Sequence, residues 1–133
     1  MNELKIGFGK TLHGFGFQEA LDRVTQALAA EGFGVLTEID VQATLKKKLD
    51  VDFKQYRILG ACNPSLAHQA LVAAPHVGLL LPCNVVVQEL AEGEVEVMIA
   101  DPRAMFSLVR EPSLEAVVTE AEQRLRRALD SLE

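Results

Sequence analysis

The chain contains no tryptophan, a single tyrosine and only two cysteines among its 133 residues. This leaves little aromatic surface on which bases could stack. The net charge of −6 also argues against a basic face for a phosphate backbone. The one basic run, Lys46–Lys48, is typical of a solvated helix face. We therefore expect no nucleic-acid partner.

Long apolar runs are absent as well. Runs such as Val77–Leu81 are far shorter than the roughly 20 residues that cross a bilayer. Residues Met1–Ile6 lack the charged region, apolar stretch and cleavage site of a secretory signal. We expect a cytoplasmic protein with no membrane contact. In that compartment thiols stay reduced, so a structural disulfide between Cys62 and Cys83 is not the first expectation.

Apolar residues are plentiful, at 49% of the chain. That fraction is enough to build a core without a disulfide or a metal, and it argues against disorder. No linker, internal repeat or low-complexity segment divides the sequence. We expect residues 1–133 to form one domain.

The spacing of apolar residues indicates both helices and strands. Apolar side chains recur every three or four positions in two long segments, Phe17–Gly32 and Ser113–Leu132. Other segments alternate, and Glu92-Gly93 is a hairpin turn signal. The expected strands are Leu4–Phe8, Phe33–Ile39, Phe53–Ala61, Gly78–Leu81, Val85–Leu90 and Glu94–Ile99, of which the fourth and fifth form either one bent strand or two.

Four polar residues mark predicted helix starts. Asp40, Asn63, Asp101 and Ser113 each precede a helical pattern, and proline follows two of them at the first helical position. At least one strand pair is a hairpin, so the sheet cannot be wholly parallel. We expect an α+β fold: a mainly antiparallel sheet of four to six strands with helices packed on one face.

From Phe17 onward the sequence contains a series of short motifs: Gly32-Phe33, Ile39-Asp40, Gly60, Asn63-Pro64, Ala74-Pro75, Leu81-Pro82 and Asp101-Pro102. This series resembles the domain of unknown function 302 family. The resemblance implies a small α+β domain similar to TATA-binding-protein-like folds, and a homodimer. It implies no established activity and therefore no catalytic residues.

Two Cys-Asn dipeptides, Cys62-Asn63 and Cys83-Asn84, each stand where an apolar run meets a turn signal. Cys62 lies beside the start of a predicted helix, whose free amides and dipole stabilise a thiolate, and Ser65 adds a hydroxyl. If the two strands are neighbours, the two sulfurs can meet. The alternative is that each cysteine is a small buried apolar residue, as most free cysteines are.

No other residues form a convincing chemical site. The two cysteines are not part of a Cys-x-x-Cys pair, and His68 and His76 do not complete a zinc spacing, so we expect no metal or cofactor. Asp40 is explained as a helix cap.

We expect a homodimeric binding or interaction module for an unidentified small molecule or protein, with a pocket around the Cys-Asn dipeptides. The alternative is a thiol-based redox or sulfur-handling protein.

Overall fold

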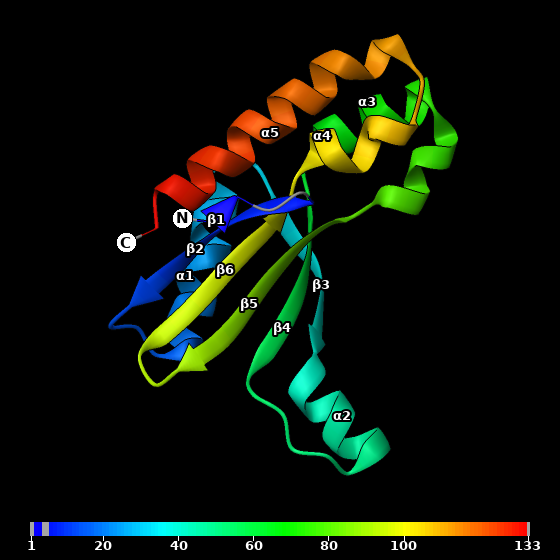
Figure 1. Ribbon diagram of the computed structural model, residues 1–133. Coiled ribbons are helices and arrows are strands. Elements are labelled where there is room, and N and C mark those ends of the chain that lie inside the picture. Colours follow the sequence, from blue (N-terminus) through cyan, green and yellow to red (C-terminus); the bar gives the residue numbers. More distant parts are fainter. Residues whose placement is uncertain (1, 4–5, 133) are drawn as a thin grey trace.

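An antiparallel sheet of six strands forms the framework of the computed structural model (Figure 1), within the residues it describes, 2–3 and 6–132. The strand order is β1–β2–β6–β5–β4–β3. The strands are β1 (Asn2–Glu3), β2 (Gly7–His13), β3 (Gly34–Asp40), β4 (Tyr56–Cys62), β5 (Cys83–Ala91) and β6 (Glu94–Ala100).

Two long helices cover one face of this sheet. Their buried stripes pack against alternate strand residues such as Phe8, Val85 and Val97, and this packing forms the larger of two apolar clusters. The α-helices are α1 (Phe17–Ala30), α2 (Val41–Leu49), α3 (Pro64–Ala73), α4 (Pro102–Met105) and α5 (Glu115–Asp130), and the 3₁₀-helices are η1 (Pro75–Leu80), η2 (Phe106–Leu108) and η3 (Pro112–Leu114). The covering helices are α1 and α5, so the α+β prediction is confirmed.

The remaining helices lie at opposite ends of the sheet (Figure 1). At one end α2 continues from β3. At the other end α3, η1, α4 and η2 form what we call the helical cap. The cap packs against the start of α5 and buries a second apolar cluster, which includes Val77, Phe106 and Val117. No helix in the described ranges is long and apolar enough to cross a membrane.

Three of the four predicted helix caps are confirmed. The Asp40, Asn63 and Asp101 side chains each accept a backbone hydrogen bond from the first turn of the following helix, at 2.9, 3.2 and 2.9 Å. The prediction for Ser113 is wrong. There the Glu111 carboxylate accepts the hydrogen bond, from the Ser113 amide at 3.3 Å, and α5 begins only after the 3₁₀ turn η3.

Two predicted strands also need correction. Gly78–Leu81 is not a strand, because most of it lies in the 3₁₀-helix η1, where Val77 is buried in the cap cluster. The start of the expected strand Leu4–Phe8 lies outside the described residues; within them β2 begins at Gly7, and Ile6 is exposed rather than buried. Gly7 suits this position because a Cβ atom there would collide with the carbonyl oxygen of Ile99.

Candidate functional site

A cavity of about 40 Å³ lies where β4 ends and β5 begins. Residues of both apolar clusters line it: Phe33 and Ala61 belong to the larger cluster, and Ala70 and Phe106 belong to the cap cluster. The cap and α5 enclose it on the side away from the sheet. Its lining residues are Phe33, Ala61, Cys62, Asn63, Leu66, Ala67, Ala70, Leu81, Cys83, Pro102, Phe106, Val117, Val118 and Ala121.

The two cysteines border this one cavity but do not form the side-by-side pair that the sequence analysis considered. Strands β4 and β5 are neighbours, as that idea required. However, the residue directly opposite Cys83 is Ala61, and Cys62 is one position further along. Successive side chains of a strand point to opposite faces, so this offset keeps the thiols apart. Both cysteines are free and half-buried.

Burial determines the protonation state of the Cys83 thiol. The apolar surroundings disfavour a thiolate, and the neighbouring Cys62 adds to the effect, so the pKa of Cys83 rises from 9.0 to about 11. A thiol with such a pKa is neutral at physiological pH. Cys83 is therefore a poor nucleophile and a poor metal ligand, since both roles need the thiolate.

Asn63 contributes to the wall of the cavity and to its rigidity. Its side chain is buried, and its Oδ1 accepts the hydrogen bond from the Leu66 amide that starts α3. On its other side it packs against Gly32, which has a φ of +85°. A Cβ atom on Gly32 would lie 2.9 Å from the Asn63 Nδ2 and 3.2 Å from the Arg124 Nη1. Glycine thus suits this position both for its backbone and for the close approach.

The other two predicted site residues lie elsewhere. Asn84 follows Cys83 and points to the opposite face, where it is exposed and borders a separate surface hollow beside Pro82 and Met105. Ser65 is exposed on α3 and accepts a hydrogen bond from Gln69 at 3.4 Å. The cavity therefore brings together Cys62, Asn63 and Cys83 and leaves out Ser65 and Asn84.

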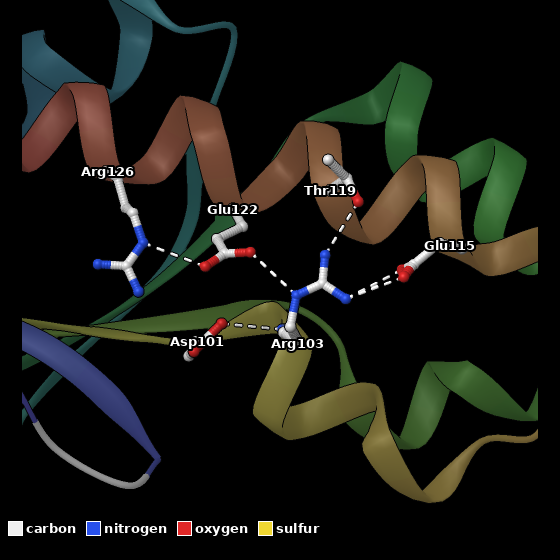
Figure 2. A network of polar contacts seen from close by, with 6 residues as sticks. All are labelled: Asp101, Arg103, Glu115, Thr119, Glu122 and Arg126. Carbon is white, nitrogen blue, oxygen red and sulfur yellow. Dashed lines mark hydrogen bonds and ion pairs between the residues drawn. The ribbon is translucent and has the colours of Figure 1, made fainter.

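An ion-pair network holds α4 against α5 (Figure 2). Arg103, in α4, donates to Glu115 at 2.9 and 3.0 Å, to the Thr119 hydroxyl at 2.9 Å and to Glu122 at 3.1 Å. Burial alone would raise the pKa of Glu122, but the hydrogen bonds from Arg103 and Arg126 outweigh it and lower that pKa. Because α4 supplies part of the cavity wall, Arg103 keeps that wall in place.

Arg103 and the α5 side of the cavity were not predicted from the sequence. Glu115, Thr119 and Glu122 follow a helical spacing, so they share one polar face, yet nothing in the sequence pairs that face with Arg103. Among the described residues no buried side-chain oxygen or nitrogen lacks a hydrogen-bond partner. Nor, in the same ranges, do three or more His, Cys, Asp or Glu side chains gather as a metal site. The cavity thus offers an apolar surface with two thiols.

Comparison with known proteins agrees with the resemblance noted in the sequence. The domain of unknown function DUF302 matches residues 8–132. The crystal structure of an uncharacterised conserved DUF302 protein from Bacillus stearothermophilus is similar, with a TM-score of 0.86 and 29% identity over 96% of this chain and 98% of that one. No curated protein matches the chain significantly. The chain therefore belongs to the DUF302 family, a family of unknown function.

Proposed function

We propose that the protein is a binding module whose ligand site is the cavity between the sheet and the helical cap. The observation that carries this proposal is an apolar space left open at the boundary between two well-packed clusters. Protein interiors ordinarily close such spaces, because unfilled volume forfeits dispersion contacts.

The ligand class follows from the lining. No fully buried side-chain nitrogen or oxygen in the described residues lacks a hydrogen-bond partner, and most of the side chains that line the cavity are apolar, so the site favours an apolar ligand. A volume of 40 Å³ corresponds to about three water-sized groups. The site thus suits a small apolar molecule, or the apolar end of a larger one that enters where the cap meets the sheet.

The experiment uses xenon and cyclopropane as probes, because apolar cavities in proteins bind such molecules. Methyl NMR spectra of the full chain are recorded with each probe. We expect chemical-shift changes at the methyl groups of Ala61, Ala67 and Ala121, which line the cavity. Methyl groups outside it, such as that of the exposed Ala116, serve as internal references.

A filled variant makes the test specific. Ala121→Val places extra atoms in the cavity, and Ala116→Val makes the same change at an exposed position of α5. We expect the shift changes to vanish in the first variant and to persist in the second. The proposal is overturned if the wild-type methyl groups do not respond, or if both variants respond like the wild type.

The thiol-based alternative has one observation in its favour: both thiols border the same cavity. In that function the two thiols would lose two protons and two electrons to an oxidant such as diamide, and a disulfide would form. The raised pKa of Cys83 argues against it. Stoichiometric disulfide formation on addition of diamide, measured by mass spectrometry of the intact protein, would replace our proposal with this one. An unchanged mass would reject the alternative.

A further inference from the structure

A surface hollow of about 220 Å³ lies beside the cavity. Its walls come from η1, from the turn that leads into β5, from the end of β6 and from α4. These segments meet at the end of the sheet that carries the helical cap (Figure 1). Two residues, Leu81 and Cys83, line both the hollow and the cavity. The two spaces are therefore neighbours that share a wall.

The shared wall is held by apolar packing. Leu81 is half-buried and packs against the cap cluster, as do Leu80 and Met105, which also line the hollow. A leucine side chain forms no hydrogen bonds, so Leu81 can change rotamer without breaking one. Cys83, at the first position of β5, is half-buried as well. A small rearrangement of these side chains would connect the hollow to the cavity.

The chemistry of the hollow matches that of the cavity. Neither space is lined by a charged side chain, and in the hollow Asn84 alone contributes a side-chain oxygen or nitrogen. Leu79 borders the hollow and is 90% exposed, more than any other large apolar side chain in the described residues. A ligand that covers Leu79 with apolar atoms removes this surface from water, which favours binding.

We infer, on the basis of the proposed function, that the ligand is a linear aliphatic chain that occupies both spaces. The cavity holds about three water-sized groups, which is the length of about three methylenes, so a longer chain must continue outside it. Because the shared wall separates the two spaces, a ligand that occupies both must be thin where it passes Leu81 and Cys83. A chain of methylenes meets this requirement, whereas a ring does not.

The experiment compares propan-1-ol, hexan-1-ol and cyclohexanol as probes, with binding to the full chain followed by methyl NMR. Propan-1-ol fits the cavity alone, hexan-1-ol reaches the hollow, and cyclohexanol carries its six carbons in a ring. We expect hexan-1-ol to bind at least tenfold more tightly than the other two, because each buried methylene strengthens binding roughly fourfold. It should shift the methyl signals of both Ala61, in the cavity, and Leu79, in the hollow.

A change at the rim of the hollow makes the test specific. Leu79→Ser removes an apolar contact from the hollow and leaves the cavity lining intact. It should weaken hexan-1-ol binding roughly threefold or more and leave propan-1-ol binding unchanged. The matched control is Leu108→Ser, which changes a leucine that is 88% exposed in the 3₁₀-helix η2 and does not line the hollow. This control should bind hexan-1-ol like the wild type.

The outcomes separate the ligand class from the proposed function. If xenon binds in the cavity but hexan-1-ol binds no more tightly than propan-1-ol or cyclohexanol, the linear chain is overturned and the apolar site remains. Equal binding of hexan-1-ol by the Leu79→Ser and Leu108→Ser proteins, or a response at Leu79 without one at Ala61, would also overturn it. Cavity methyl groups that do not respond to xenon would remove the proposed function itself, and the linear chain with it.

Discussion

Gly60 offers the sharpest test of how the cavity wall is built. It lies in β4, immediately before Ala61 and Cys62, and on the uncovered face Pro82 packs over it. A Cβ atom at this position would lie 2.7 Å from the Pro82 Cγ and would collide with the Thr37 hydroxyl oxygen. The contact of the proline ring with Gly60 helps to fix the position of Leu81 and Cys83, which line the cavity.

We expect Gly60→Ala to destabilise the protein. Thr37 is exposed and can change rotamer, but the proline ring cannot move away without shifting its backbone. Overpacking of this kind costs about 1–3 kcal/mol. For a domain of this size that corresponds to a fall in melting temperature of about 4–12 °C. The measurement is urea denaturation together with thermal unfolding by circular dichroism.

The matched control is Gly34→Ala in the neighbouring strand. A Cβ atom on Gly34 meets no other atom within 4 Å, so the same substitution there should be neutral or stabilise by up to about 1 kcal/mol. Adding Thr37→Ala to Gly60→Ala should recover only part of the loss, because the contact with Pro82 remains. Equal stabilities of the Gly60→Ala and Gly34→Ala proteins would show that Pro82 does not pack on Gly60 as described.

Three further predictions concern the residues around the cavity. The folded-state pKa of Cys83 is about 11 against 9.0 ordinarily, so its thiol retains its proton in the folded protein after the unfolded chain has lost it. Stability should therefore fall as pH rises from 9 to 11, by roughly 2–3 kcal/mol, and Cys83→Ala should remove that slope in urea titrations. Arg103→Ala should speed amide hydrogen exchange across residues 102–108, because α4 loses its ion pairs with α5. Arg110→Ala, at an exposed position, is the control. Exchange in the Arg103→Ala protein that is no faster than in this control would contradict the prediction. Asn63→Ala should lower the free energy of unfolding by about 0.5–2 kcal/mol through loss of the α3 cap, and a loss no larger than that of the neighbouring Ser65→Ala would refute the role of the cap.

Local interactions explain why much of the fold was predictable. The caps at Asp40, Asn63 and Asp101 each depend on atoms two or three residues away, so the sequence contains both partners of the hydrogen bond. The hairpin at Gly93 depends on one residue that adopts a positive φ, here +77°. The stripe of α1 depends on a helical period, which the sequence displays directly.

The errors arise where the deciding partner is distant or the signal is ambiguous. A run as short as Val77–Leu81 reads equally well as a buried strand or as a helical turn. It became a 3₁₀-helix because Pro75 starts one and the helical cap buries Val77. At the last helix the Glu111 carboxylate accepts hydrogen bonds from both the amide and the hydroxyl of Ser113, so this hydroxyl does not cap the helix.

Only part of the candidate site could be predicted, because the register of β4 and β5 determines which side chains lie opposite one another. Both cysteines reached the same cavity, but a register that places Ala61 opposite Cys83 separates the thiols by one position. Moving the β4 thiol from position 62 to position 61 should therefore allow it to form a disulfide with Cys83. The double variant Ala61→Cys/Cys62→Ala puts two cysteines directly across β4 and β5, at a Cα separation of roughly 4.5–5.5 Å, which a disulfide can span. We expect it to form that disulfide under mild oxidation, as seen by the mass of the intact protein, while the wild type does not. If the wild type oxidises as readily as the variant, the register does not separate the thiols in solution.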